Sequence, residues 1–419
     1  MSRRITVVGG GWAGCAAALT LAEAGCRVTL LEAAPQLGGR ARAIRLAGQA
    51  LDNGQHILLG AYTQTLALLR RVHAGPESGY LLRLPLELAS PPDFVLRCPD
   101  LPAPLHLLAG VLGARGLGWR DKLATLAAAR RLMGHAPLPA SVGAALAGQP
   151  ATAWKYLWEP LCLAALNTPP GQACATSFRA VLQGAFAGRR EHSDLLLPRH
   201  DLGALFPEPA AARLRALGGE VVLGRRVRNL SLERDRVVLD GDSACDGVVL
   251  AVAPWHAAAL LQPLPALAAG LAAYPTEAIA TAYLRYPASV HLPKPMLGLA
   301  GGPGQYAFDR GASHGQHGLI AVVASAANGL AASPREAWLA RIADQAEALL
   351  GARPVWARGV LEKRATWACV PGLERPPIAT PHPRLVLAGD YTAGPYPATL
   401  ESACCSGVQS AHTLLRHLP

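Results

Sequence analysis

The first apolar positions of the chain form two short runs separated by a glycine-rich turn and a helical stretch. Residues 5–8, ITVV, are mostly β-branched, which is typical of a buried parallel strand. The Ala- and Leu-rich stretch 15–24 predicts a helix that stops at Gly25, and residues 27–31 predict a second strand closed by Glu32. This order of strand, turn, helix, strand and acid predicts a dinucleotide-binding unit.

The turn, GGGWAG at residues 9–14, has the G-x-G-x-x-G spacing. Gly9 permits the tight turn, Gly11 lets the backbone approach a pyrophosphate, and Gly14 lets the helix pack against the strand. The free N–H groups of the first helical turn, which includes Trp12 and Ala13, then face the phosphates, and the helix dipole adds partial positive charge.

Two further groups extend this predicted site. Glu32 lies where a carboxylate can accept hydrogen bonds from a ribose hydroxyl. The glycine pair Gly38-Gly39 allows close backbone approach, and Arg40 can meet a phosphate.

The end of the chain predicts a second contact region for the same ligand. Residues 384–388 form a predicted strand that ends in Gly389-Asp390, and a helix is predicted over 398–418. Asp390 would lie on the ligand edge of the sheet, and the helix N-terminus near Thr399 would bring a second positive dipole end there. A long FAD molecule needs such a distant second site, whereas an NAD enzyme has no evident need for one.

Length and pattern together predict an α/β protein of two domains. The nucleotide-binding domain is expected to comprise residues 1–75, 200–265 and 381–419, and the substrate domain residues 76–199 and 266–380. Within the first of these substrate segments, 105–112 and 119–133 predict an apolar helix followed by a basic amphipathic one. Such a pair can lie in a bilayer interface over residues 101–133, although core-facing helices have the same pattern.

Charge and cysteine content narrow the class of partner and the compartment. The 39 basic and 28 acidic residues give a formal charge of +11, but the arginines are scattered without aromatic residues between them, which disfavours nucleic acid. An anionic membrane surface explains both the charge and the apolar content. The nine cysteines form no C-x-x-C pair, so we expect reduced thiols in a cytoplasmic protein and no metal site. From the charge and the apolar content we expect peripheral association with the inner membrane. Prolines interrupt the uncharged stretch 247–276, which therefore is not expected to span a membrane.

Together these motifs resemble the FAD-dependent amine oxidase and phytoene desaturase superfamily. Within it, the chain is similar over nearly its whole length to the squalene-associated desaturase-like family, which contains hydroxysqualene dehydroxylases of bacterial hopanoid and squalene synthesis. The segments that carry this closer resemblance are DNGQH at 52–56, GAY at 60–62, WEPLC at 158–162, NTP at 167–169, LLLPR at 195–199 and residues 389–401.

The resemblance implies a Rossmann-type FAD-binding domain with an inserted mixed α+β substrate domain, acting on a C30 isoprenoid. Hydroxysqualene would lose its allylic hydroxyl as water while reduced flavin supplies a hydride to the same carbon. A positioned acid must protonate the leaving hydroxyl. The candidates for this acid are Asp52 and His56, followed by Tyr396 and Glu159, and each has a purely structural alternative. The resemblance also makes Val227, in an expected later strand, a weaker candidate for an adenine-side contact. The electron donor that reduces the flavin is not identified.

Three rival functions remain from the same resemblance. Carotene desaturases also act on long polyenes, and their substrate would reduce the flavin instead of oxidising it. Amine oxidases carry an aromatic residue near the start of the last helix, where this chain has Thr399, which disfavours amine oxidation. Escorts of prenylated proteins share the fold but have degenerate flavin sites, whereas the glycines and both acids are present here.

Overall fold

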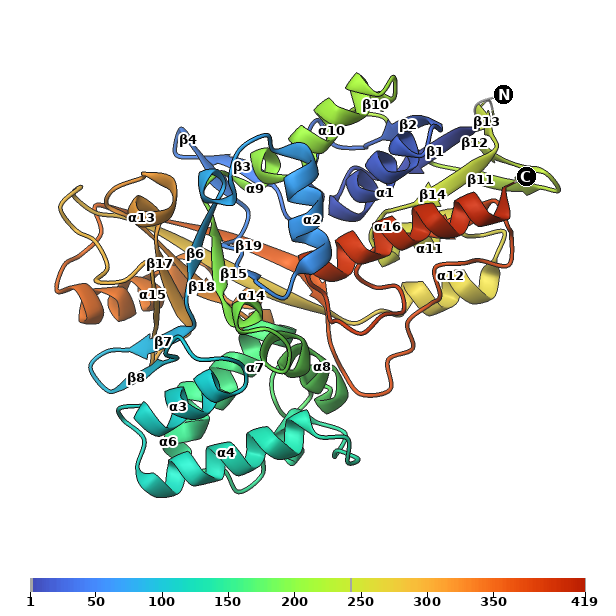
Figure 1. The fold of residues 1–419 in the computed structure, drawn as a ribbon. Coiled ribbons are helices and arrows are strands. Elements are labelled where there is room, and N and C mark those ends of the chain that lie inside the picture. The colour runs from blue at the N-terminus through green and yellow to red at the C-terminus, as the bar shows by residue number, and fades with distance from the viewer. Residues whose placement is uncertain (1–2, 242, 419) are drawn as a thin grey trace.

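A five-stranded parallel sheet forms the nucleotide-side half of the molecule in the computed structural model, which describes residues 3–241 and 243–418 (Figure 1). The strand order is β10 (Glu220–Val222), β2 (Arg27–Leu31), β1 (Arg4–Val8), β14 (Gly247–Leu250) and β20 (Leu385–Leu387). Every neighbouring pair is parallel, and all residues of β14 and β20 are buried. Three segments far apart in the sequence therefore build one sheet, as expected for an α/β fold.

Helix α1 (Trp12–Glu23) starts directly after the glycine turn and is buried along almost its whole length. It lies beside α16 (Leu400–His417), the last helix, as Figure 1 shows. A Cβ atom at Gly407 would be only 2.2 Å from the Ala13 carbonyl oxygen, so glycine is required for this close approach. Helices α2 (Thr63–Val72), α9 (Leu202–Leu205) and α10 (Pro207–Ala216) complete this side.

A second five-stranded sheet is antiparallel and belongs to the other half. Its order is β16 (Met296–Gly298), β17 (Tyr306–Asp309), β18 (Leu319–Ala324), β15 (Thr276–Arg285) and β19 (Trp356–Trp367). Helices α13 (Arg310–His314), α14 (Asn328–Ala331) and α15 (Arg335–Leu350) accompany it. Trp338 of α15 is buried against the sheet, because Gly359 of β19 leaves room for its ring.

A helical lobe hangs below both sheets in Figure 1. It contains α3 (Leu105–Gly113), α4 (Trp119–Met133), α5 (Val142–Ala145), α6 (Ala151–Ala153), α7 (Glu159–Leu166) and α8 (Ala175–Phe186). A single π-helical turn, Trp154–Trp158, leads into α7. Both helices predicted over 105–112 and 119–133 are therefore present.

Short strands and helices connect these units. They are β3 (Ala43–Leu46) with β4 (Gln49–Asp52), β5 (Leu58–Leu59) with β9 (Leu195–Pro198) and β6 (Leu81–Leu84), β7 (Glu87–Ser90) with β8 (Phe94–Arg97), β11 (Leu230–Glu233) with β12 (Arg236–Leu239) and β13 (Ser243–Cys245), and helices α11 (Pro254–Leu260) and α12 (Pro265–Ala272). Strand β5 pairs with β9, so the chain after the 52–56 segment is held against residues 195–196. The proposed domain boundaries stay a prediction.

All nine cysteines are free thiols. Among the residues that the structure describes, none of the helices combines the length and apolar character needed to cross a bilayer.

Candidate active site

The glycine turn between β1 and α1 has the tight geometry that its spacing predicts. Gly9 has φ +107°, a conformation that favours glycine, and a Cβ atom there would be 2.5 Å from the Ala251 carbonyl oxygen. A Cβ atom at Gly14 would be 1.9 Å from the Gly9 carbonyl oxygen. A Cβ atom at Gly11, by contrast, would meet only the Gly39 Cα atom, at 3.8 Å. The backbone at Gly11 is therefore open to a ligand, while the other two glycines hold the turn together.

Glu32, at the end of β2, holds this turn to the sheet. Its carboxylate accepts a hydrogen bond of 2.6 Å from the Gly10 N–H and one of 2.7 Å from the Ala34 N–H. A carboxylate can accept about four hydrogen bonds, so two of its lone-pair positions are left for a ribose hydroxyl. The predicted ribose contact stays a prediction, and the structure adds a backbone-anchoring contact that the sequence pattern did not indicate.

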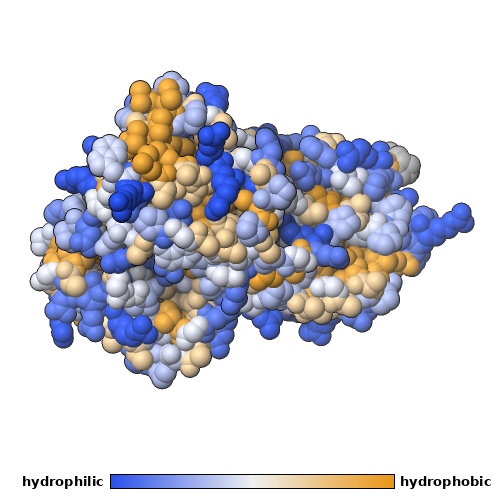
Figure 2. Space-filling view, turned by 90° about the horizontal axis from the view of Figure 1, so that it is seen from below, coloured by the Kyte–Doolittle hydropathy of each residue, from blue (hydrophilic) through white to orange (hydrophobic). Residues whose placement is uncertain are grey.

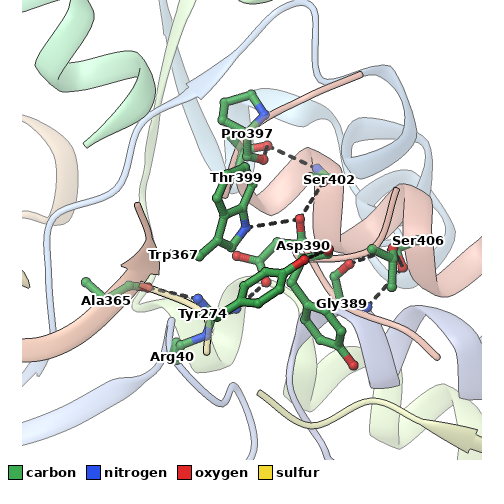
Figure 3. Close-up of polar contacts among 12 residues, drawn as sticks. Arg40, Tyr274, Ala365, Trp367, Gly389, Asp390, Pro397, Thr399, Ser402 and Ser406 are labelled. Atoms are coloured by element: carbon green, nitrogen blue, oxygen red, sulfur yellow. Dashed lines mark hydrogen bonds and ion pairs between the residues drawn. The ribbon is translucent and has the colours of Figure 1, made fainter. Parts of the chain in front are cut away.

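Arg40 and Asp390, which come from opposite ends of the chain, meet in an ion pair (Figure 3). Arg40 Nη1 also donates a 3.0 Å hydrogen bond to the Ala365 carbonyl. The Asp390 side chain is buried and its backbone carbonyl accepts hydrogen bonds from Trp367 Nε1 and Arg375 Nη2, at 3.3 and 2.8 Å. The loop after β20 is thus tied to both the glycine pair region and the end of β19.

The final helix begins beside this pair. Thr399 is the N-cap of α16, and its hydroxyl accepts a 3.1 Å hydrogen bond from the Ser402 N–H. The Gly389 N–H donates to the Ser406 hydroxyl at 2.9 Å, which fixes the strand end against the helix (Figure 3). Since α16 has eighteen residues, its N-terminus presents a full helix dipole toward the same region as α1.

One cavity of about 860 Å³ joins these parts, a volume within the usual range for a ligand site. Its wall contains all the predicted cofactor residues except Gly14, namely Gly9, Gly11, Trp12, Ala13, Glu32, Gly38, Gly39, Arg40, Val227, Gly389, Asp390 and Thr399. Gly14 is inside the turn. The amino-terminal turn and the carboxyl-terminal acid therefore open into the same space, as a single elongated nucleotide requires.

The chemistry of this wall fits FAD. An open glycine backbone and two helix N-termini supply N–H donors and positive potential for a pyrophosphate. Glu32 and Asp390 supply carboxylates for hydroxyl groups, and residues of α7 and β17 form an apolar part of the wall.

Of the four predicted acids, only His56 lines the cavity. Its Nδ1 atom is 2.8 Å from the Gly54 carbonyl oxygen, so Nδ1 carries the hydrogen and Nε2 is the free ring nitrogen. Burial lowers the pKa of His56, although the Gly54 carbonyl opposes this shift. Glu159 at the start of α7 and the half-buried Tyr396 do not line the cavity, and burial raises the pKa of Tyr396.

Asp52 is also outside the cavity wall, in a buried polar cluster behind it. One carboxylate oxygen accepts the Leu202 N–H at 2.7 Å, and the other pairs with the buried Arg310 at 3.2 Å. Burial raises the pKa of Asp52 to about 6, and the Arg310 guanidinium limits that rise. Arg310 donates to Gln55 Oε1 at 3.0 Å as well, and Tyr283 donates to the Asp52 carbonyl at 2.7 Å. These contacts fix Asp52 and Gln55, and thereby the backbone that leads into His56.

Several cavity residues were missed by the sequence reasoning. Tyr306 and Phe308 lie two positions apart on β17 and both face the cavity, as the period of a strand requires. Burial raises the pKa of Tyr306, so its hydroxyl stays protonated at neutral pH. Asn167, which ends α7 in a left-handed conformation, donates to Thr366 Oγ1 at 2.9 Å and also lines the cavity. Two sequence patterns could have pointed to these residues: the alternation Tyr306-Ala307-Phe308 and the sequence Asn167-Thr168-Pro169.

The sequence also matches a family of known proteins. The family described as flavin containing amine oxidoreductase matches residues 12–415. The chain belongs to this family. Among its curated relatives, a protein named hydroxysqualene dehydroxylase from Rhodopseudomonas palustris is 31% identical, and the likeness covers 99% of both chains. A protein of the same name from Sinorhizobium fredii is 29% identical over 99% of both chains.

A solved oxidoreductase from Methanosarcina mazei has a TM-score of 0.73 at 16% identity, covering 98% of this chain and 99% of that one. At this identity the likeness concerns the fold alone. Family membership and fold together confirm the predicted α/β class, the FAD cofactor and the oxidoreductase activity. Which residues hold the flavin and which act in catalysis stay predictions.

Proposed function

We propose that this flavin-containing oxidoreductase is a hydroxysqualene dehydroxylase, which reduces hydroxysqualene to squalene. The observation that carries the proposal is the single cavity whose nucleotide motifs come from both chain ends and whose other walls are largely apolar. The full-length likeness to proteins of that name supports the same substrate class.

The reaction balances with hydroxysqualene, one proton and reduced flavin as the reactants. The C–O bond breaks, a proton converts the leaving hydroxyl to water, and a hydride forms the new C–H bond. Reduced flavin, when bound, supplies the hydride and its two electrons. The protein must therefore position the alcohol, deliver one proton, and exclude water from the allylic cation that develops.

For the flavin we propose the turn containing Gly9 and Gly11 as the pyrophosphate contact, with Arg40 and Asp390 beside it. The open backbone at Gly11, the opposite charges of Arg40 and Asp390, and the placement of all four residues along one cavity support this assignment. Glu32 would bind the ribose on the adenine side, near Val227. Val227 is not in a strand, as was expected, but in the connection between β10 and β11.

For the proton we propose His56, because it is the predicted acid with access to the cavity. Tyr306 would hold the substrate hydroxyl by donating a hydrogen bond, since its own hydroxyl stays protonated. Phe308 would present a π-face to the developing cation, and the aliphatic side chains of α7 would exclude water. We assign Asp52 a positioning role, through Arg310 and Gln55.

We also propose that the helical lobe docks on an anionic membrane. Large apolar side chains that are at least 37% exposed gather on its surface, and Figure 2, viewed from the side of this lobe, shows a cluster of hydrophobic residues on it. The members of this apolar surface are Leu101, Leu105, Leu108, Leu112, Trp119 and Leu123. Arg115, Arg120 and Lys122 lie in the same stretch of chain, and cations there favour anionic lipid headgroups. Leu126 and Met133, also on α4, are partly buried and pack against the core.

The test of the proposed activity uses purified protein loaded with FAD and reduced chemically in the absence of oxygen. We expect hydroxysqualene to be converted to squalene and phytoene to remain unchanged, measured by gas chromatography of the extracted lipids. Consumption of phytoene by the oxidised protein, with hydroxysqualene untouched, would favour a carotenoid desaturase instead.

A further inference from the structure

Two cysteines 195 positions apart, Cys174 and Cys369, are joined through their backbones. The Cys174 N–H donates a 2.7 Å hydrogen bond to the Cys369 carbonyl. A direct backbone hydrogen bond is compatible with the Cα separation of about 4.4–6.8 Å that a disulfide spans. The Ser177 side chain acts to lower the pKa of both thiols, so both lie within its reach.

The two thiols have opposite surroundings. Cys174 is half-buried and precedes α8, and its sulfur is 3.0 Å from the Thr176 hydroxyl. Burial opposes ionisation of Cys174, but hydrogen bonds from Thr176 and Ser177 outweigh it and lower the pKa of the thiol. Cys369 is fully buried, and burial raises its pKa to about 11. A partly exposed thiol with a lowered pKa beside a protected thiol is the arrangement of an attacking cysteine and its resolving partner.

The segments that carry these cysteines also form the cavity wall. Asn167 and Thr366, both lining residues, are joined by a hydrogen bond, and the Thr168 hydroxyl accepts the Cys369 N–H at 2.9 Å. A covalent link between Cys174 and Cys369 would therefore tie the chain after α7 to the chain after β19, next to the reactive end of the site.

We propose that Cys174 and Cys369 are a peroxide-sensitive dithiol that closes to a disulfide. The Cys174 sulfur attacks hydrogen peroxide, so that an S–O bond forms, the O–O bond breaks, and the first water leaves after protonation. The Cys369 sulfur then attacks the Cys174 sulfur, so that the S–S bond forms, the S–O bond breaks, and the second water leaves with the Cys369 proton. The two thiols are oxidised by two electrons and one peroxide is reduced to two waters.

Two other cysteines provide controls. Cys405 is exposed to a similar degree as Cys174, but burial and the Glu401 carboxylate raise its pKa to about 12. Cys162 lies near Cys369 but is fully buried, and burial raises its pKa to about 12. Neither therefore offers an accessible thiolate.

The experiment treats the FAD-loaded full chain with equimolar hydrogen peroxide, blocks the remaining thiols, and digests it for mass spectrometry without reduction. We expect a linked peptide pair containing Cys174 and Cys369 that dithiothreitol separates. In Cys369→Ser the sulfenic acid of Cys174 should persist and react with dimedone, and Cys162→Ser should behave as the parent protein. Cys174 should react at least about tenfold faster than Cys405, because a lower pKa gives a larger thiolate fraction.

The proposal would be overturned by a link between Cys174 and Cys162, by equal dimedone labelling of Cys405 and Cys174, or by the absence of any Cys174 oxidation. These readouts are masses of peptides. They are therefore independent of the dehydroxylase activity and remain decisive even if that activity is not found.

Discussion

The two ends of the cavity are built in different ways. At the nucleotide end, the glycine turn gets its shape from local backbone conformation. Gly9 has a positive φ, and a side chain at Gly14 would clash with the Gly9 carbonyl oxygen. At the reactive end, His56, Asn167 and Tyr306 come from three separate segments and meet only because two sheets and the helical lobe fold together. In the proposed site, local geometry therefore shapes the cofactor end, whereas tertiary packing determines which side chains line the proposed substrate end.

The largest expected effect comes from a substitution in the glycine turn, which changes only the nucleotide end. In Gly14→Ala the new Cβ atom would lie 1.9 Å from the Gly9 carbonyl oxygen, so the turn must open. We expect the protein to lose bound flavin entirely, measured by the flavin absorbance that remains after gel filtration.

The matched control is Gly270→Ala in α12, where a Cβ atom meets nothing within 4 Å. It should keep its flavin and gain up to about 1 kcal/mol of stability, because alanine favours a helix over glycine. Full flavin content in Gly14→Ala would contradict the role of the turn.

The next largest effect is expected from a substitution of His56, which changes only the proposed reactive end. His56→Gln should keep FAD but lower kcat by about 10²–10⁴, the usual contribution of a general acid. The protonated imidazole is the active form and burial lowers its pKa, so the parent kcat should rise as the pH falls below the ordinary histidine value of about 6.5. His56→Gln should lack this rise, in steady-state assays across that pH range. The exposed His135→Gln serves as the control, and an unchanged pH profile in His56→Gln would exclude His56 as the acid.

A third change concerns the support of the reactive end. Asp52→Asn leaves the buried Arg310 without its anionic partner, and breaking a buried pair costs about 3–5 kcal/mol of unfolding free energy. Denaturant unfolding measures this cost. Glu347→Gln, which removes the partner of the exposed Arg353, should cost less than about 1 kcal/mol. Equal losses in the two variants would mean that Asp52 does not anchor the segment.

The smallest effect leaves both ends intact and tests the helical lobe. Leu108→Asp/Leu112→Asp should reduce flotation with anionic liposomes, because two apolar side chains of the lobe surface become charged, while flavin content stays constant. Leu217→Asp/Leu223→Asp is a closely matched control, since these leucines are 37% and 41% exposed and Leu112 and Leu108 have the same values. Identical flotation of both double variants would reject this docking surface.

Sequence reasoning was most successful where the signal is short-range. The strand runs, the glycine turn, and the two helices over 105–133 all follow from periodicity and from conformations that few residues adopt. The polar segment at 52–56 contributes four residues to the cavity wall, but its pattern does not tell which side chain points inward. The partner of Asp52 is 258 residues away, so the sequence could not indicate that this carboxylate forms a buried ion pair. Tyr306 was missed because its importance depends on where β17 lies in the second sheet.

The most direct test of the account is a single turnover in deuterated water, without oxygen, with one equivalent of hydroxysqualene per reduced FAD. The account predicts one squalene per flavin oxidised, with a single deuterium on the carbon that carried the hydroxyl, because the flavin hydride exchanges with solvent before transfer. Squalene without deuterium at that carbon, or flavin that remains reduced, would contradict it.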